Sequence, residues 1–485
     1  MCAPGGTMSG VHRDKPWSLA INTLLQWGFI GVCVLLLGGC ARIQIPAPSQ
    51  DVDRQALVLT ITDLRGTLKP CGCSPDLERG GVDRIAHRVE EIRKNHPNSL
   101  LFHAGNLFVD DEGVPPSRRK QTDRRLRALG DSMRWIGVTA TTLGEYDLEQ
   151  GLAWLKTAAL SIPTPIVATN VSGPGWDAIA QKTLLVETQG IRVGVVGIVP
   201  PGEGVVEPLP ALRQASKSLR DQGADVVIAL SAIGLRQAKR LLRKEPGIDL
   251  LVAGGQGLTA QVSSEAERFG NGWLVQSHIQ GSHVGQINLA FEAKSRGPLT
   301  HQQTSKGDSG RHFQYELSPI GWDLPSHPKV LGIMQAYNRD LASINLKVAG
   351  TLPPLKEGQA SYVGVDACLE CHEEVKTFWH ADKHQKAWDT LVQGGKTFDL
   401  ECVSCHTTGY GQPGGAILGA LKNLKTVQCE SCHGPGSIHA EDEDPDSIQL
   451  VVPESVCVTC HNAKHSTGFK YDFYRSKLMV PGHGK

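Results

Sequence analysis

Short apolar runs alternate with amphipathic segments between residues 55 and 292. Runs of strand length occupy residues 56–61, 99–103, 138–143, 166–170, 191–199, 225–230 and 248–253, and residues 272–277 and 285–291 look like a closing pair. Residues 82–94 instead have the periodicity of a helix with one apolar face. Strands that alternate with helices are typical of α/β proteins, so residues 55–292 are predicted to form an α/β domain.

The pattern changes after residue 292. Residues 294–315 are polar and rich in Gly, Ser and Gln, which favours a loop. Residues 328–346 repeat apolar positions on one helical face, and prolines and a glycine follow at residues 353–358. Residues 293–360 are therefore predicted to be a connector with one helix, and residues 361–485 a separate domain.

The N-terminus has the pattern of a targeting segment. Arg13 and Lys15 precede an apolar run over residues 24–37, which ends in Leu-Gly-Gly-Cys at Cys40. A positive region, an apolar run and small residues before a cysteine are typical of a bacterial lipoprotein signal peptide. We therefore expect residues 1–39 to be removed and Cys40 to be lipidated. An uncleaved single anchor is the alternative.

Residues 40–54 are expected to form a tether between the lipid and the first domain. Acyl chains on Cys40 would attach the protein to a membrane. This predicts a lipoprotein of the cell envelope that faces the periplasm or the cell surface. Ala41, directly after the cysteine, favours the outer membrane.

The composition narrows the functional classes. Lys plus Arg and Asp plus Glu both number 49, so no bulk charge favours nucleic acid as a partner. Hydrophobic residues make up 40% of the 485 residues, which is ordinary for a globular protein and too low for a protein that crosses a membrane many times.

A Cys-x-x-Cys-His motif occurs four times near the C-terminus. The cysteines are Cys368, Cys371, Cys402, Cys405, Cys429, Cys432, Cys457 and Cys460, and the histidines that follow each pair are His372, His406, His433 and His461. This spacing lets two thiols add to the vinyl groups of one porphyrin while the histidine becomes the proximal iron ligand. A redox dithiol or a zinc ribbon would use similar pairs, but neither needs a histidine after every one. The motifs therefore predict four covalent c-type haems.

The sixth iron ligands must come from the remaining side chains of this domain. They include His380, His384, His439, His465 and His483, together with one methionine, Met479. Bis-His coordination should therefore dominate, with Met/His coordination available to at most one haem. His465 lies four residues after His461, so we expect it to serve a neighbouring haem. Either a ligand or a surface role is open to His380.

From residue 362 onward the chain resembles the tetrahaem cytochrome c-554 family. The similarity extends beyond the motifs to Tyr362-Val363-Gly364, residues 379–388, Thr408-Gly409-Tyr410-Gly411 and residues 427–439. The resemblance implies a mostly helical and irregular multihaem domain with closely stacked haems and an electron-transfer role. It also implies His384 and His439 as distal ligands, and a five-coordinate iron at the second motif, above His406.

The α/β part resembles the 5′-nucleotidase branch of the calcineurin-like metallophosphoesterases. The order of that family's motifs is followed by Thr62-Asp63-Leu64-Arg65-Gly66, His103-Ala104-Gly105-Asn106, Leu143-Gly144-Glu145-Tyr146-Asp147 and residues 249–257. The resemblance implies a sandwich of two β-sheets flanked by helices.

The metal-binding pattern of that family is degenerate in this chain. Positions that carry ligands in the family hold Arg65, Asn106, Tyr146, Ala232, Gly255 and Gly257, while Asp63 and Asp147 remain acidic. Two divalent ions about 4 Å apart need a bridging carboxylate, and Arg65 would put a fixed positive charge in their place. We therefore expect no divalent metal pair and no two-metal hydrolysis.

One local motif remains open. Cys71 and Cys73 follow the first predicted strand, close to where the lost metals would lie. They are either a disulfide or free thiols in an exported loop, or a redox or soft-metal site.

The sequence thus predicts an exported, lipid-anchored tetrahaem cytochrome that transfers electrons between redox proteins of the cell envelope. The α/β domain would serve as a docking or binding module. The alternatives are an oxidoreductase that acts on a small molecule at a five-coordinate haem, and a phosphoesterase with a rearranged metal site.

Overall fold

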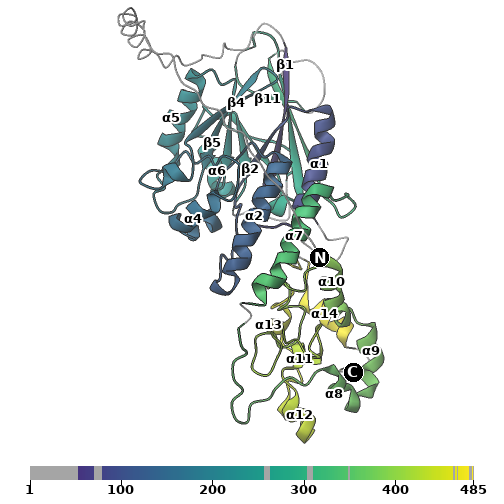
Figure 1. Cartoon of the computed structure of the whole chain (residues 1–485). Coiled ribbons are helices and arrows are strands. Elements are labelled where there is room, and N and C mark those ends of the chain that lie inside the picture. Colours follow the sequence, from purple (N-terminus) through teal and green to yellow (C-terminus); the bar gives the residue numbers. More distant parts are fainter. Residues whose placement is uncertain are drawn as a thin grey trace, which may run out of the picture. The chain divides into compact units, whose positions relative to one another are not determined.

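The apolar runs form two six-stranded sheets in a computed structural model of the chain (Figure 1). The structure describes residues 53–69, 79–255, 263–295, 297–302, 310–347, 350–462, 465–466, 468–479 and 483. The first sheet has the strand order β11 (Thr300–His301), β12 (Arg311–Pro319), β10 (His283–Phe291), β1 (Arg54–Thr62), β2 (Leu100–Ala104) and β3 (Ala140–Thr141). The second has the order β4 (Thr183–Thr188), β5 (Ile191–Ile198), β6 (Val226–Ser231), β7 (Leu250–Ala253), β9 (Gly272–Gln276) and β8 (Glu267–Phe269).

Both sheets are mixed. β1 pairs in parallel with β2 and antiparallel with β10, and β5, β6, β7 and β9 form a parallel series with an antiparallel strand at either edge. Parallel strands that are covered on both faces need a continuous apolar run. This explains why β5 and β6 are almost wholly buried and were predictable from their sequences.

The two faces of β1 build two different cores. Leu57, Leu59 and Ile61 pack against the helices outside the first sheet, whereas Ala56 and Val58 face the second sheet. This follows from the two-residue period of a strand. The interior between the sheets is the apolar core of the sandwich.

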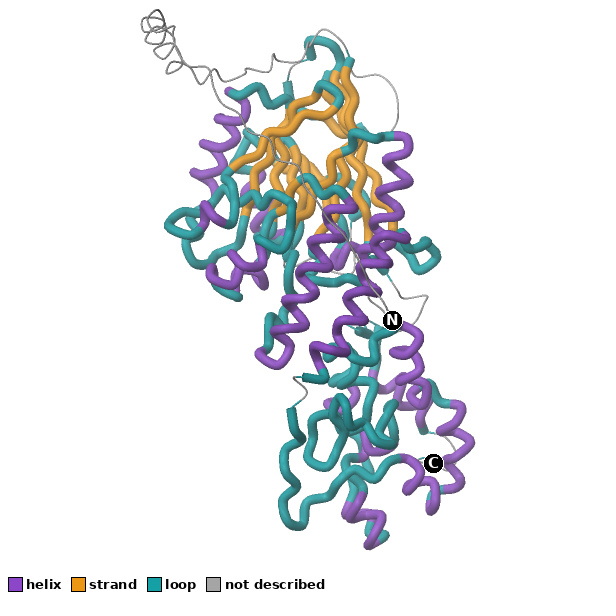
Figure 2. The backbone as a smooth tube through the Cα atoms, viewed as in Figure 1, coloured by secondary structure: helices purple, strands orange, loops and turns teal. Residues whose placement is uncertain are grey.

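Helices cover the outer faces of both sheets (Figure 2). The first sheet is covered by α1 (Val82–Asn95), α2 (Arg119–Ile136) and α7 (Pro328–Asn345), and the second by α5 (Pro208–Asp221) and α6 (Leu235–Leu242). The short helices α3 (Glu145–Glu149) and α4 (Leu152–Ala159) follow β3. The expected sandwich of two sheets flanked by helices is confirmed.

Three expectations about the strands need correction. The supposed closing pair is not a pair, because β9 and β10 belong to different sheets. The stretch expected as a loop at 294–315 contains β11 and the start of β12, whose polar side chains are mostly half-exposed. Residues 166–170 make isolated bridges instead of a strand.

The α/β domain also continues beyond residue 292. β12 pairs with β10 along its whole length. Val330, Met334, Tyr337 and Leu341 of α7 are buried in the same core as α1 and α2. Residues expected to be a connector are therefore part of this domain, because an amphipathic helix is stable only when its apolar face is covered.

The C-terminal domain is helical and irregular, as expected. Its helices are α8 (Val365–Cys371), α9 (Lys376–Ala381), α10 (Ala387–Gly394), α11 (Cys429–His433), α12 (Ser437–Asp442), α13 (Glu454–Cys457) and α14 (Tyr471–Leu478). Its one apolar cluster among the described residues centres on Leu391, Val403 and Leu418. Within the ranges given above, no helix has both the length and the apolar character that crossing a bilayer requires.

Candidate haem-binding and metal sites

The first, third and fourth Cys-x-x-Cys-His motifs begin on helices. Cys368 and Cys371 lie in α8, the third motif forms α11, and Cys457 ends α13. The amide of His372 bonds to the carbonyl of Cys368, and the amide of His461 to that of Cys457. These helical hydrogen bonds place each histidine one turn beyond the first cysteine.

The second motif lies in a series of turns. The amide of Cys405 bonds to the carbonyl of Cys402, and the amide of His406 bonds to the carbonyl of Val403. This tighter, 3₁₀-type spacing also keeps the two thiols on one side of the chain.

The motif cysteines are free thiols that meet in pairs from different motifs. Cys368 hydrogen-bonds to Cys429, which raises the pKa of Cys368, and hydrogen bonding from Cys405 lowers the pKa of Cys460 to about 6. The first motif therefore touches the third, and the second touches the fourth.

Three proximal histidines each face a second imidazole. The ring centroids of His372 and His439 are 6.2 Å apart, those of His384 and His461 are 6.0 Å apart, and those of His433 and His483 are 5.9 Å apart. A metal–imidazole bond of about 2 Å on each side, plus the radii of both rings, requires the two ring centroids to lie about 6 Å apart. The spacing of all three pairs therefore fits an iron between the rings.

In five of these six rings, the Nδ1 nitrogen is held by a protein group. Nδ1 contacts a backbone carbonyl in His433 (Gln449, 2.7 Å), His439 (Asp444, 2.9 Å) and His483 (Leu478, 2.7 Å). In His384 it contacts the Asp382 carboxylate at 2.8 Å, and in His461 it contacts the Ser466 hydroxyl at 3.0 Å. A proton on Nδ1 leaves the lone pair of Nε2 available to bind a metal, which is the arrangement usual for metal-ligating histidines.

His406 is arranged differently from the other three proximal histidines. Its Nδ1 donates to the carbonyl of Ala387 at 2.5 Å and lies 3.4 Å from the Thr390 hydroxyl. Burial lowers the pKa of this ring. Its Nε2 is thus also available to iron, but His406 belongs to none of the three imidazole pairs found among the described residues of the C-terminal domain.

The remaining candidate ligands occupy other positions. The backbone amide of His465 bonds to Asn462 in the turn after the fourth motif. His380 is exposed, and Met479 follows the end of α14. Of the distal ligands expected from the sequence, His384 and His439 therefore lie opposite histidines of the motifs, whereas the ring opposite His433 is that of His483. Sequence reasoning did not select His483, because only the fold brings this C-terminal residue to His433.

A buried carboxylate holds the first and third motifs together. Glu430, inside the third motif, is 2% exposed and accepts hydrogen bonds from the amides of Val363, Gly364 and Gly436. Since it lies inside the third motif and binds the backbone just before the first, Glu430 is part of the frame of the site.

In the α/β domain, Asp63 is the acidic residue that remains of the family's first metal motif, and it is hydrogen-bonded to groups of the protein itself. Asp63 is fully buried, and its Oδ1 accepts from the amide and side chain of Asn106 at 3.0 and 3.1 Å. Its Oδ2 accepts from the amide of Gly255 at 2.8 Å. Burial raises the pKa of Asp63, against the effect of Arg65 and of these hydrogen bonds.

Asp147, the second acidic residue, is also hydrogen-bonded to groups of the protein. Asp147 is buried and accepts from the amides of Leu107, Phe108 and Gly144, at 2.8 to 3.1 Å. Burial outweighs these bonds and raises the pKa of Asp147 to about 6. Both carboxylates thus serve as hydrogen-bond acceptors for the loops that end the strands.

Arg65 lies beside this network. Its guanidinium stands 5.4 Å from the ring centre of Tyr146, and its charge acts on Asp63. No group of three or more His, Cys, Asp or Glu side chains suited to a metal ion occurs in the described part of the chain.

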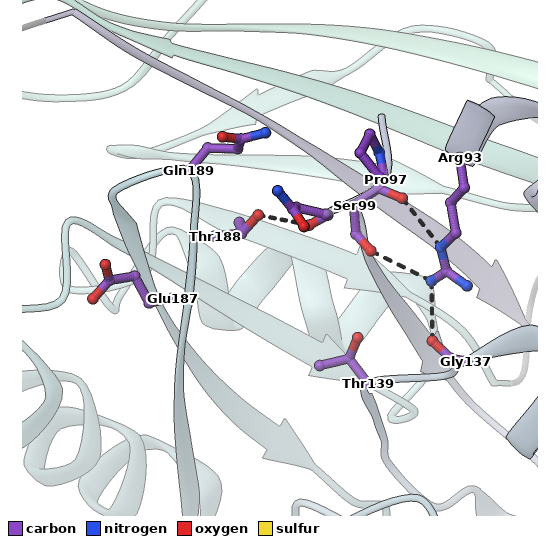
Figure 3. Close-up of a pocket in the computed structure, with 9 residues that line it drawn as sticks. Arg93, Pro97, Ser99, Gly137, Thr139, Glu187, Thr188 and Gln189 are labelled. Atoms are coloured by element: carbon purple, nitrogen blue, oxygen red, sulfur yellow. Dashed lines mark hydrogen bonds between the residues drawn. The ribbon is translucent and has the colours of Figure 1, made fainter. Parts of the chain in front are cut away.

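A shallow hollow of about 430 Å³ elsewhere on this domain is lined by polar residues (Figure 3). Its one arginine, Arg93, donates to the carbonyls of Ile136, Ser99 and Gly137 and to the Ser99 hydroxyl. The guanidinium thus ties the end of α2 to the turn that precedes β2. Cys40, Cys71 and Cys73 lie outside the described residues.

The C-terminal domain and the α/β domain are similar to different known proteins. Residues 367–434 match the family described as cytochrome c554 and c-prime. Cytochrome c-554 of Nitrosomonas europaea is 36% identical over 110 residues, which cover 18% of this chain and 47% of that protein.

The α/β region has its own relatives. A probable 5′-nucleotidase of Treponema pallidum is 24% identical over 245 residues, which cover 46% of this chain and 40% of that protein. The structure of a 5′-nucleotidase precursor from Thermus thermophilus matches 64% of this chain and 61% of its own, with a TM-score of 0.50 and 19% identity. This chain spans less than half the length of either curated relative. It therefore joins a region of 5′-nucleotidase-like, calcineurin-type phosphoesterase fold to a C-terminal segment that matches the cytochrome c554 family.

Proposed function

We propose that this chain is an exported, lipid-anchored cytochrome that carries four c-type haems and transfers electrons between redox proteins of the cell envelope. The observation that carries the proposal is the set of three imidazole pairs, each about 6 Å apart, formed by histidines that belong to or face the Cys-x-x-Cys-His motifs. When bound, haem supplies one-electron chemistry. The chain attaches the porphyrins, ligates the irons and fixes their spacing.

The ring pairs favour a specific set of axial ligands. His439 would complete the haem attached at the first motif, His483 the third and His384 the fourth. Bis-imidazole ligation lacks the thioether that raises the potential of Met/His cytochromes, so these haems should have low potentials. The contacts between thiols of different motifs support closely spaced haems.

The haem count tests the proposal directly. Intact mass and a pyridine haemochrome assay should give four covalent haems per chain. A count of two or fewer, or zinc bound by the cysteines, would overturn the assignment.

The localisation rests on the N-terminal pattern and needs its own test. Cys40→Ser should leave an unprocessed or soluble protein, since the acyl chains attach at this residue. Unchanged processing and membrane association in this variant would contradict the lipid anchor.

A small-molecule oxidoreductase is the second candidate, because His406 has a free Nε2 and is in none of the imidazole pairs. Carbon monoxide should bind about a quarter of the haem in the reduced protein if one of four irons is open. His483→Ala, which removes a proposed distal ligand, serves as a positive control and should double this fraction. If carbon monoxide binds the variant but not the wild type, the oxidoreductase candidate is excluded and electron transfer is the remaining function.

The α/β domain is proposed to bind or dock a partner without hydrolysing phosphoesters by the two-metal route. Asp63 and Asp147 accept three or more hydrogen bonds each from the protein, which leaves them poorly placed to bridge two ions. Saturating manganese or zinc should give no turnover of nucleoside monophosphates. Turnover that Asp63→Ala abolishes would revive the phosphoesterase alternative.

A further inference from the structure

A buried polar cluster joins the α/β domain to the second haem motif. It consists of Gln121 and Arg125 of α2, Asn345 at the end of α7, and Asp399 and Glu401 just before Cys402. Gln121, Asn345 and Asp399 are at most 3% exposed, and Arg125 is 6% exposed. Polar groups this deeply buried are costly unless they are paired, so their pairing fixes the chain around them.

The amide side chains of the α/β domain hold the backbone before the motif. Gln121 Nε2 donates to Asp399 Oδ1 at 2.7 Å, and Gln121 Oε1 accepts from the amide of Leu400 at 3.0 Å. Asn345 Nδ2 donates at 2.7 Å both to Gln121 Oε1 and to the carbonyl of Phe398. Three consecutive residues, 398–400, are thus bound by two side chains from another domain.

Asp399 passes this constraint to the motif. Its carbonyl accepts from the amides of Cys402 and Val403 at 2.9 and 3.0 Å, so the turn that presents the first thiol begins on it. Lys396 stands on the other side, with its Nζ 3.8 Å from Asp399 and 3.9 Å from Cys402 Sγ. Gln121 of α2 therefore acts on the position of Cys402 through Asp399.

Arg125 adds a fixed charge at the same place. Its Nη1 donates to Glu401 Oε1 at 2.6 Å, and Arg118 reaches the same oxygen at 3.3 Å but is shared with Glu112. Burial alone would lower the pKa of Arg125, but the charge and hydrogen bond of Glu401 together with Tyr337 and Asp110 outweigh burial and raise it, so the guanidinium stays charged. The closest cation to Glu401 is thus a residue of the α/β domain.

The same arginine also contacts the degenerate metal motif. A Cβ atom on Gly66 would lie 3.4 Å from Arg125 Cζ and 2.4 Å from the carbonyl oxygen of Phe108. Gly66 has a φ of +69°, so it is one position where the close approach and the backbone angle both require glycine. The loop at the position of the family's first metal motif thus packs against the arginine that pairs with Glu401.

We propose that the α/β domain is a structural part of the second haem site, in which Gln121 and Asn345 are positioning residues for 398–402 and Arg125 balances the charge of Glu401 beside the porphyrin. This inference rests on the proposed haem-binding function. It assigns the phosphoesterase-like fold a role that needs neither metal nor phosphoester.

Removing Arg125 or Glu401 from this charge pair should shift the potential of the second haem in opposite directions, which tests the proposal. Without Arg125, the enclosed Glu401 carboxylate would stabilise the ferric form of the adjacent haem, so Arg125→Gln should shift that haem to a lower potential. Without Glu401, the guanidinium would favour the ferrous form, so Glu401→Gln should shift it upward. Each change should alter the reduced-to-oxidised ratio at a fixed poise on the order of tenfold, as for one charge across a protein interior. The double variant should lie close to the wild type.

Spectroelectrochemical titration of the full chain measures these shifts. The component of the second haem is assigned by comparison with Cys402→Ser/Cys405→Ser, which lacks it. Arg124→Gln is the matched control, because Arg124 lies on the same helix and pairs with the half-exposed Asp340. It should leave all four haems unchanged.

The outcomes separate this inference from the proposed function. Opposite shifts confined to the second haem support the inference, and Glu401→Gln alone decides the sign if Arg125→Gln does not accumulate. Shifts of the same sign in both variants, shifts in every haem, or no shift would overturn it. A wild-type protein without covalent haem would instead refute the proposed function.

Discussion

At the scale of single residues, Glu430 shows how a haem motif can stabilise the fold that surrounds it. Its carboxylate accepts three backbone amides from two segments and is almost fully enclosed. A buried amide that loses its acceptor costs about 1–3 kcal/mol. This residue lies between the two cysteines of a motif whose x positions are otherwise free to vary.

We expect Glu430→Ala to lower the free energy of unfolding by about 3 kcal/mol or more, because it leaves three buried donors unpaired. Urea unfolding of the haem-loaded protein, followed by far-UV circular dichroism, measures the change. Glu441→Ala removes an exposed glutamate of the same domain and should cost little. Equal stability of the two variants would show that Glu430 has no structural role.

His103 gives the α/β domain an acid sensitivity of its own. Its Nε2 accepts the amide of Leu64 at 3.3 Å and its Nδ1 contacts the Thr141 hydroxyl at 2.8 Å, so the buried ring is neutral. Burial lowers the pKa of His103 to about 3. A depressed pKa means that the unfolded chain binds the proton more readily, so this residue contributes stability above its unfolded pKa near 6.5 that is lost as the pH falls toward 3.

Unfolding free energies between pH 7 and pH 3 test this. The wild type should lose up to about 1.4 kcal/mol per pH unit more than His103→Gln, since one extra proton binds on unfolding. Identical pH slopes for the two proteins would mean that His103 is not protonated on unfolding.

At the scale of elements, the end of α14 positions the histidine that we propose as the distal ligand of the third haem. The carbonyl of Leu478 holds His483 Nδ1, and the ring of His483 stacks on Phe378 with a centroid distance of 5.2 Å. Its other neighbour is His433. The helix and the aromatic ring thus direct Nε2 toward the third motif.

His483→Ala should convert one haem from low to high spin while all four remain attached, because attachment depends on the Cys-x-x-Cys-His motif. Optical and electron paramagnetic resonance spectra measure the high-spin fraction. His465→Ala, which tests the ligand expected from the sequence, should leave the spectra unchanged. The reverse result would restore His465 as the distal ligand.

Elements differ in how much of them the sequence could predict. β5 and β6 were predictable because strands buried on both faces need continuous apolar runs. β12 was missed because its exposed side chains are polar and its pairing with β10 supplies the order that its own pattern lacks.

The candidate sites were likewise only partly predictable from the sequence. Attachment and proximal ligation follow from residues within five positions of each other, so the motifs predicted them. The partners of the proximal histidines lie far along the chain, and Arg125 and Glu401 leave no local pattern at all, because only tertiary packing brings them together.

At the scale of the whole molecule, one side chain belongs to two cores. Phe398 packs against both the helical core of the first sheet and the small apolar cluster of the C-terminal domain. A residue shared in this way couples the unfolding of the two parts. Their stabilities should therefore not be independent.

Thermal unfolding followed by far-UV circular dichroism and by the Soret band should give coincident midpoints in the wild type. Phe398→Ala should separate the two transitions and destabilise the protein by about 2 kcal/mol, since a partly buried ring is lost from both cores. Phe473→Ala, at a ring that is 54% exposed, is the matched control. Separate transitions in the wild type would contradict the coupling.

The central place of β1 sets the order in which the chain takes shape during synthesis. β1 pairs with β10, so that Arg54 lies opposite Phe291, and β10 in turn pairs with β12. A chain that emerges N-terminus first cannot close this sheet until residue 319 has emerged. Cys368 and the other motif cysteines are made after that point. The α/β domain can therefore be complete before the first motif thiol emerges, and a nascent chain arrested before β12 should stay open to proteases however long it waits.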